Sequence, residues 1–357
     1  MMNFTHKSKK ILFLYAELAT YFTNCLNLLS EENNIEIHLV KLPVNKEAPF
    51  QLKLHPKINV YEKNNFSANE LERLASSISP DLIYCSGWIE KDYLKICKKF
   101  KKNIPVIVGL DNQWEGKLKQ YLASIISRFT LLNYFSHCWV PGKPQLKYAE
   151  KLGFKRKNTF TGFYSADVDF FRKQFLEYKE LKKNKLPHRF IFVGRYYEFK
   201  GIKDLWQAFI ELKNETENDW ELWCLGVGDI EPIQHPNIKH FGFVQANEIS
   251  KYIKETSVFV LPSHKEPWGV VVHEFAAAGF PLICSDKVGA ASGFLEPNKN
   301  GYIYHSGNIE ELKSKLKKII SLTDNELFKM SEISAEKALQ ITPEKWKNTI
   351  LSILNKN

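Results

Sequence analysis

The chain has 357 residues, which is more than one ordinary hydrophobic core needs and suits two domains. Its 44% hydrophobic and 25% charged residues are typical of a soluble globular protein, and no apolar run is long enough to cross a bilayer. Residues 1–186 carry 30 Lys and Arg against 18 Asp and Glu, whereas the remainder carries 20 against 22. This basic half would attract an anionic surface, such as membrane lipid, a phospholipid-linked acceptor or nucleic acid, although a solvated face explains it equally well.

The basic start of the chain precedes an apolar run, as in an export signal. Glu17 interrupts that run and no small-residue cleavage site follows, so we expect a first β-strand over residues 11–15. The six cysteines are scattered singly, and Cys85, Cys224 and Cys284 fall inside apolar runs. We therefore expect buried free thiols in a reducing, cytoplasmic compartment and no zinc site, although spacing alone leaves a redox pair open.

Short apolar runs alternate with helical patterns in the first half, which predicts an α/β domain with a parallel sheet over residues 1–165. The expected strands are residues 11–15, 35–39, 82–85, 105–108 and 138–140, and the expected helices are 69–77, 91–100 and 143–152.

The polar, lysine-rich residues 166–187 are interpreted as the connection between domains. A second βα series then predicts another doubly wound domain over residues 188–341, with strands at 189–193, 221–225, 257–261 and 281–284. Thr342 and Pro343 are typical of an N-cap and a first helical residue. They predict a final helix, 342–357, that returns to the first domain.

Residues 263–279 read SHKEPWGVVVHEFAAAG and lie between two apolar runs that predict strands. This strand–loop–helix–strand order makes the two strands parallel and places the loop at the carboxyl edge of the sheet, where ligands bind in open α/β sheets. Glu266 precedes the helix and Glu274 lies within it, so the helix N-terminus with its N–H groups falls between them. The stretch can therefore hold an anionic group beside a polyol.

A second loop at the same edge carries two cations. Residues 190–201 read FIFVGRYYEFKG, so Arg195 and Lys200 lie between a strand and a helix. Two cations suit a diphosphate, with Arg as a fork and Lys as a point charge. Either residue alone would more commonly be an ordinary surface cation, but the pairing with the Glu266 loop favours binding.

These residues resemble a known family. FVGRYYEFKG, GVGD at 226–229, HFGFV at 240–244 and EPWGVVVHE at 266–274 resemble, in the same order, the retaining nucleotide-sugar glycosyltransferases of family 4, or glycosyl transferases group 1. The resemblance continues through residues 285–312 and is specific as a combination. It implies the GT-B architecture, in which two doubly wound Rossmann-like domains face a central cleft. The first domain would bind the acceptor and the second the nucleotide sugar.

The resemblance also implies roles for single residues. Arg195 and Lys200 would neutralise the donor diphosphate, and Glu266 would lie against the donor sugar near the reacting centre. Glu274 would accept hydrogen bonds from the ribose hydroxyls. The other implied donor-binding positions are Gly194, the backbone N–H groups of Trp268, Gly269 and Val270, and, near the base, Phe243 and Val244. If the cations and a helix terminus carry the leaving-group charge, the reaction needs no metal and no cofactor beyond the nucleotide sugar.

The first domain departs from the family pattern. The loop after its first strand, AELATYF, lacks the family's glycines, and no histidine lies near the segment VGLDNQWEG at 108–116. Asp111 is the candidate for the histidine's position, where it could accept a proton or hydrogen bond from the acceptor, although an Asx turn is an equal alternative. Trp88 and Trp114 could stack on acceptor sugars at this edge, but packing is the more common fate of tryptophan.

Three other patterns carry less weight. Asp167, Val168 and Asp169 spell the D-x-D metal motif of the other large glycosyltransferase fold, but their place in the chain favours a structural role. The segment HEFAA at 273–277 lacks the second histidine of a zincin. No G-x-G-x-x-G follows the first strand, which counts against a dinucleotide oxidoreductase.

The resemblance thus implies a metal-independent retaining hexosyltransferase. Its partners would be a nucleotide-diphosphate sugar, with UDP expected first and GDP second, and a hydroxyl of a glycan or lipid-linked acceptor in surface polysaccharide or lipopolysaccharide synthesis. The enzyme would be cytoplasmic or peripheral on the inner membrane face, and no nucleic-acid partner is expected. Two alternatives stay open: a GT-B nucleotide-sugar epimerase, and a non-catalytic protein that binds glycans or nucleotide sugars.

Overall fold

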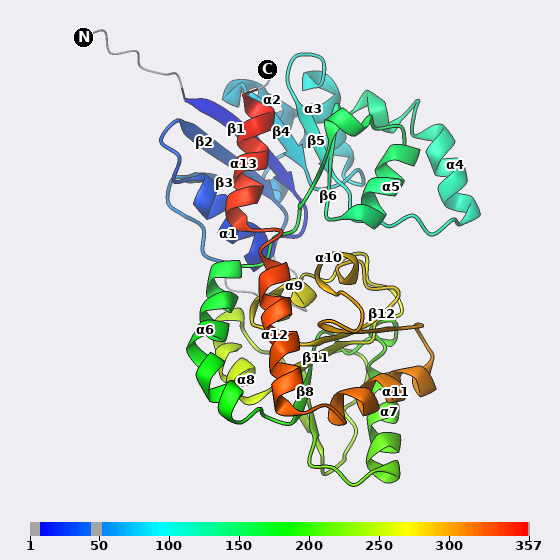
Figure 1. Ribbon diagram of the computed structural model, residues 1–357. Coiled ribbons are helices and arrows are strands. Elements are labelled where there is room, and N and C mark those ends of the chain that lie inside the picture. Colours follow the sequence, from blue (N-terminus) through cyan, green and yellow to red (C-terminus); the bar gives the residue numbers. More distant parts are fainter. Residues whose placement is uncertain (1–7, 44–51, 356–357) are drawn as a thin grey trace. The chain divides into compact units, whose positions relative to one another are not determined.

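The computed structural model describes residues 8–43 and 52–355, and the chain divides into two α/β units. The first unit joins Met1–Ser165 to Pro343–Asn357, and the second is Ala166–Thr342 (Figure 1). Every strand pair within the two sheets is parallel, so each unit is Rossmann-like and the expected fold class is confirmed.

The sheet of the first unit has the order β3-β2-β1-β4-β5-β6-β7. Its strands are β1 (Lys9–Tyr15), β2 (Ile35–Lys41), β3 (Ile58–Glu62), β4 (Leu82–Cys85), β5 (Val106–Gly109), β6 (His137–Val140) and β7 (Thr159–Thr161). Alternate residues of β1 enter different core clusters, with Leu12 and Leu14 in one and Ile11 and Phe13 in the other. The central strands read as continuous apolar runs because helices cover both faces of a parallel sheet.

The helices of the first unit are α1 (Thr20–Leu29), α2 (Ala68–Ile78), α3 (Lys91–Phe100), α4 (Leu118–Ile126), α5 (Lys143–Lys151) and α13 (Pro343–Leu354). Short 3₁₀ turns lie at Lys63–Asn65, Leu131–Asn133 and Arg156–Asn158. The final helix, α13, joins this unit through Trp346, whose ring centroid lies 5.1 Å from that of Trp139 and 5.6 Å from that of Phe22.

The sheet of the second unit has the order β10-β9-β8-β11-β12-β13. Its strands are β8 (Arg189–Val193), β9 (Glu221–Leu225), β10 (Ile238–His240), β11 (Val258–Leu261), β12 (Leu282–Ser285) and β13 (Gly301–Tyr304). Its helices are α6 (Val168–Asn184), α7 (Ile202–Glu215), α8 (Ser250–Glu255), α9 (Val270–Ala277), α10 (Ala291–Phe294), α11 (Ile309–Ile320) and α12 (Asp324–Ala338), with 3₁₀ turns at Glu198–Lys200 and Ala246–Glu248.

The interpretation of residues 166–187 as a connection is corrected by the structure, because most of this segment forms α6. Asp167 caps the helix by accepting a hydrogen bond from the Phe170 N–H at 3.1 Å. Phe175 packs so closely on Gly279 that a Cβ added there would lie 2.2 Å from the phenyl ring. Most of the polar residues that suggested a linker lie on the solvent side of α6, whereas Gln174 and Lys182 are buried with its apolar stripe.

Candidate functional site

Two loops leave neighbouring strands at the carboxyl edge of the second sheet. Strand β8 pairs with β11 in parallel, with Phe190 opposite Val258 and Ile191 opposite Phe259. The chain that follows β8 carries Arg195 and Lys200, and the chain that follows β11 carries Glu266. Because the two strands are adjacent and parallel, their following loops emerge side by side, as the sequence predicts.

The first loop packs closely against the second at Gly201. This glycine has a φ of +66°, in the left-handed region, and a Cβ at this position would lie 2.2 Å from the Pro262 carbonyl oxygen. The Phe199 carbonyl accepts a hydrogen bond from the His264 N–H at 2.8 Å. Only glycine allows this approach without a shift of the backbone, and the approach sets the position of Lys200.

Lys200 and Glu266 form an ion pair between the two loops. Their side chains are only 16% and 11% exposed. The Ser263 hydroxyl donates to the Glu266 carboxylate at 3.3 Å, and the Gly289 N–H donates to the Glu266 carbonyl at 3.0 Å. The carboxylate is therefore held in a defined place, with a cation beside it that an anionic ligand could share.

Arg195 lies on the same loop, with its guanidinium carbon 5.2 Å from the centroid of the Tyr197 ring. The loop rests on the segment after β9: the Gly194 N–H donates to the Leu225 carbonyl at 3.0 Å. A Cβ at Gly226 would lie 1.9 Å from the Gly194 carbonyl oxygen. The glycines of the GVGD segment thus let its backbone approach the cation-bearing loop closely.

The N-terminus of α9 lies directly beside Glu266. Gly269 is the N-cap with a φ of +89°, and a Cβ there would lie 2.9 Å from the Glu266 Cγ. Val270 is the first helical residue, and the Trp268 carbonyl accepts a hydrogen bond from the Ala290 N–H at 2.8 Å. First-turn N–H groups have no intrahelical partner and carry the positive end of the helix dipole, so this end favours an anion.

Glu274 lies one turn into α9 and is half-buried. Burial, reinforced by the charge of Asp167, raises the pKa of Glu274 to about 7. The carboxyl therefore changes its charge near neutral pH. Such a perturbed acid, one turn from a helix terminus that favours an anion, is a candidate ligand-binding group.

His273, the neighbour of Glu274, has a structural role. Its Nδ1 accepts a hydrogen bond from the Ala166 N–H at 3.1 Å, and its Nε2 donates to the Ala338 carbonyl at 2.9 Å. Burial lowers the pKa of this imidazole to about 4. The ring is neutral and joins three segments of the second unit.

Phe243 and Val244 follow β10 at the same edge and are half-buried. The neighbouring Gly242 carbonyl accepts a hydrogen bond from the Gly226 N–H at 2.7 Å. This bond brings the segment after β10 against the segment after β9. The segment after β9 therefore lies between the one that carries Phe243 and Val244 and the loop that carries Arg195.

Asp111 follows β5 in the first unit. The Tyr164 hydroxyl donates a hydrogen bond to the Asp111 carboxylate at 3.2 Å, and Tyr21 packs edge-on against Tyr164 with ring centroids 5.4 Å apart. Burial, followed by the charges of Tyr21 and Asp111, raises the pKa of Tyr164. Sequence reasoning missed Tyr164 because no motif links it to Asp111 across 53 residues.

The two candidate acceptor tryptophans pack against the core of the first unit and are partly buried. The Trp114 ring centroid lies 4.8 Å from that of Tyr121 and 5.7 Å from that of Tyr148. The Lys151 ammonium covers the ring at 4.5 Å from its centroid. These contacts favour packing for Trp114, and partial burial in the same core favours it for Trp88.

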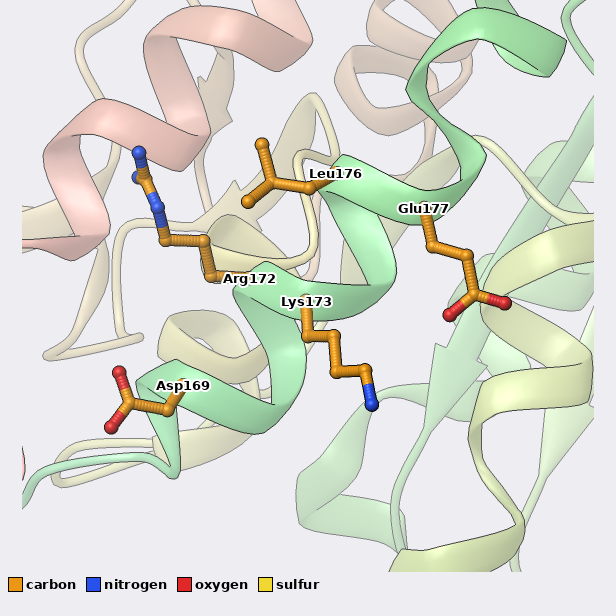
Figure 2. Close-up of a pocket in the computed structure, with 5 residues that line it drawn as sticks. All are labelled: Asp169, Arg172, Lys173, Leu176 and Glu177. Atoms are coloured by element: carbon orange, nitrogen blue, oxygen red, sulfur yellow. The ribbon is translucent and has the colours of Figure 1, made fainter.

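The D-x-D residues do not converge on one point. The Asp167 carboxylate caps α6, whereas Asp169 lines an open surface pocket on α6 (Figure 2). The other residues that line this pocket are Arg172, Lys173, Leu176 and Glu177. Over residues 8–43 and 52–355, no group of three His, Cys, Asp or Glu is arranged to hold a metal ion.

Two further features concern the described residues of both units. All six cysteines are buried and free, as the sequence predicts. Within the part of the chain that the structure describes, no helix has the length and apolarity needed to span a membrane.

The second unit matches a known family. Residues 173–337 match the family model described as Glycosyl transferases group 1. This part of the second unit is thus similar to Glycosyl transferases group 1 domains, as the sequence predicts.

The chain is also similar to curated glycosyltransferases and related enzymes. The capsular polysaccharide biosynthesis glycosyltransferase CapM of Staphylococcus aureus is 27% identical over 185 residues, which cover 48% of each chain. The alpha-monoglucosyldiacylglycerol synthase of Acholeplasma laidlawii is 26% identical over 293 residues, which cover 72% of this chain and 71% of the synthase. The chain spans about half the length of the curated relatives it matches first.

Among solved structures, HepE of Anabaena in complex with UDP has a TM-score of 0.69 and is 13% identical. The match covers 98% of this chain and 100% of HepE. At this identity the likeness concerns the fold, which is that of the GT-B glycosyltransferases.

Proposed function

We propose that this chain is a retaining hexosyltransferase of family 4. It transfers a sugar from a nucleotide-diphosphate sugar, with UDP preferred to GDP, to a hydroxyl of a glycan or lipid-linked acceptor. The observation that carries the proposal is the ion pair of Lys200 and Glu266, built beside Arg195 and the N-terminus of α9. Two cations, a helix terminus and a carboxylate at one sheet edge suit a sugar diphosphate and little else that is small.

The proposed donor roles follow from this arrangement. Arg195 and Lys200 bind the diphosphate and stabilise the negative charge that grows on it as the sugar leaves. Glu266 contacts the donor sugar, and the ionised Glu274 accepts hydrogen bonds from the ribose hydroxyls. The first-turn N–H groups of α9 donate to sugar or phosphate oxygens. No step in this scheme uses a metal.

The proposed chemistry balances without a protein nucleophile. The bond between the anomeric carbon and the diphosphate oxygen breaks, and the acceptor oxygen bonds to the same face of that carbon. The acceptor proton passes to the departing diphosphate, which lies on that face. Asp111, held by Tyr164, binds the acceptor hydroxyl or orients the donor sugar.

Two comparisons support the finer parts of the proposal. HepE of Anabaena has structures in complex with UDP and with UDP-glucose. This favours UDP as the nucleotide of the donor sugar here. CapM acts in capsular polysaccharide biosynthesis, which favours a surface glycan as product. The six free, buried thiols support a cytoplasmic site of action, on the inner face of the membrane if the acceptor is lipid-linked.

A thermal-shift panel of UDP, GDP, ADP and their sugars tests the donor assignment. The nucleotide that raises the melting temperature most should lose its effect on Arg195→Ala and keep it on Lys173→Ala, which removes an exposed cation of α6. An unchanged shift on Arg195→Ala would show that the diphosphate assignment is wrong.

Turnover separates the transferase from its rivals. The parent should release UDP only when an acceptor is present, and Glu266→Gln should bind nucleotide without turnover. Sugar interconversion without an acceptor would instead indicate an epimerase. Nucleotide binding with no turnover on any mixture of donors and acceptors would indicate a binding protein.

A further inference from the structure

Helix α4 (Leu118–Ile126) turns its large apolar side chains to solvent. None of its residues is buried. The exposed fractions of these side chains, including Phe129 just beyond the helix, are Leu118 75%, Tyr121 51%, Leu122 53%, Ile125 62%, Ile126 57% and Phe129 75%. Large apolar residues so strongly exposed along one short helix are unusual in a folded protein and mark an interaction surface.

An ordinary surface helix turns its apolar face to the protein core, whereas α4 turns its apolar face to solvent. Its apolar residues recur at intervals of three and four and so share one face. On the opposite side, Ser127 is buried and donates a hydrogen bond to the Leu152 carbonyl at 2.9 Å. Gln120 donates to the Gln113 carbonyl at 2.6 Å. Polar groups and the packing of Tyr121 on Trp114 thus attach α4 to the protein, and most of the apolar face stays exposed.

The surroundings of the apolar face are strongly basic. Lys117, Lys119 and Arg128 are exposed on or beside α4. Residues 115–158 contain nine Lys and Arg and two acidic residues, Glu150 and Glu115, of which Glu115 pairs with Lys117. Helix α5 follows within this segment and adjoins α4, since the Lys151 ammonium lies 5.9 Å from the Tyr121 ring centroid (Figure 1).

We propose that α4 is a docking surface for an anionic lipid bilayer. Its apolar face inserts among the headgroups and upper acyl chains, and the flanking lysines and arginines contact lipid phosphates. Charge selects this occupant. A second copy of the chain would bring two basic rims together, whereas an anionic membrane complements both the apolar centre and the cationic rim.

The surface is independent of the donor site, because α4 belongs to the first unit and the Lys200–Glu266 pair to the second. Docking at α4 would hold the enzyme at a membrane that presents a lipid-linked acceptor. This role for docking rests on the proposed function. Vesicle binding and nucleotide binding can be measured separately, so failure of one proposal leaves the other standing.

Vesicle co-sedimentation of the full chain tests the proposal. The protein should sediment with vesicles of phosphatidylcholine containing phosphatidylglycerol and stay in solution with phosphatidylcholine alone. The double variant Leu122→Ser with Ile126→Ser should lower the partition coefficient by about tenfold or more. Raised salt should weaken binding of the parent, because the cations act through screened charges.

A matched control uses the exposed leucines of α6. Leu176 and Leu181 are 56% and 58% exposed, close to the values of Leu122 and Ile126, so Leu176→Ser with Leu181→Ser removes similar apolar surface elsewhere. This variant should bind vesicles as the parent does, and all proteins should keep the parent's melting temperature. Absence of parent binding to anionic vesicles, or equal loss in both double variants, would overturn the proposal. If the parent does not bind vesicles and is a dimer that the α4 double variant converts to a monomer, the apolar face would be assigned to a second copy instead.

Discussion

Lys200 and Glu266, 66 residues apart in the chain, form an ion pair that joins the loops after β8 and β11. Neither side chain is more than 16% exposed, so little water competes for either charge. The pair therefore holds the Lys200 ammonium at the sheet edge, where it could also contact a bound diphosphate. It also links the geometry of the candidate site to the stability of the second unit.

Lys200→Met should destabilise the second unit by about 1–3 kcal/mol, because it removes the Lys200 ammonium from the partly buried Glu266 carboxylate. The double variant Lys200→Met with Glu266→Gln should recover part of this loss, since the carboxylate charge that Lys200 balances is then removed as well. Urea unfolding of the single and double variants measures the coupling. Strict additivity of the two single changes would contradict an energetic link between the residues.

Nucleotide binding should respond in opposite ways to the two single changes. Glu266→Gln removes the competitor for Lys200, so UDP should bind as well as to the parent or a few-fold tighter. Lys200→Met should weaken UDP binding by about tenfold, as expected for loss of one charged contact. Isothermal titration calorimetry at fixed salt gives both values. Weaker UDP binding by Glu266→Gln would contradict the proposed sharing of Lys200.

Gly201→Ala should cost about 2–4 kcal/mol of stability. Part of this is the left-handed φ of +66°, and the rest is the 2.2 Å approach of the new Cβ to the Pro262 carbonyl oxygen. Gly307→Ala is the matched control, because Gly307 has a φ of +80° with no atom within 4 Å of the added Cβ. That variant should cost only about 1 kcal/mol. Equal losses in thermal unfolding would show that the contact with Pro262 is unimportant.

Glu274 should give UDP-glucose binding a pH dependence. With a pKa raised to about 7 by burial and by Asp167, the free carboxyl is mostly protonated at pH 6 and mostly ionised at pH 8. An ionised carboxylate accepts hydrogen bonds from two ribose hydroxyls, so affinity should rise about tenfold over that range. The sugar-bound diphosphate itself does not titrate there. Glu274→Gln should bind more weakly at pH 8 and show a flat profile; a profile like that of the parent would contradict the assignment.

Glu274 should also lower the free energy of unfolding of the unliganded protein as pH rises. Below its ordinary pKa of 4.5, Glu274 is protonated in both the folded and the unfolded chain. Between that value and about 7 the unfolded chain loses the proton first, so ionisation favours unfolding. Glu274→Gln should remove this decline, which denaturant titrations at pH 5 and pH 8 can measure as the difference from the parent.

Trp346→Ala should destabilise the first unit by about 3–5 kcal/mol, since its fully buried ring packs against Trp139 and Phe22. Asn348→Ala, an exposed change in the same helix, should stay within about 0.5 kcal/mol of the parent. Two-phase thermal unfolding with and without UDP separates the units, because UDP should stabilise only the second. A small effect of Trp346→Ala would mean that α13 contributes little to the first unit.

Much of the fold could be predicted from the chain because buried parallel strands read as uninterrupted apolar runs. The predictions for β8, β9, β11 and β12 place strands where the structure has them. Helix α6 was missed, because its four lysines made the segment look like a solvated linker, although Phe171, Phe175 and even Lys182 are buried. Periodicity within a polar segment is a weak signal when only a narrow stripe of the helix is apolar.

The sequence alone determined which chemical groups the second unit can offer. A strand, a loop with Arg195 and Lys200, and a strand–loop–helix with Glu266 and Glu274 are local features, and parallel pairing puts them at one edge. Only the tertiary structure decided that Lys200 pairs with Glu266, since that contact depends on the fit of Gly201 under Pro262. The contact of Tyr164 with Asp111 and the outward apolar face of α4 likewise depend on which neighbours a side chain meets, and chain order does not encode such neighbours directly.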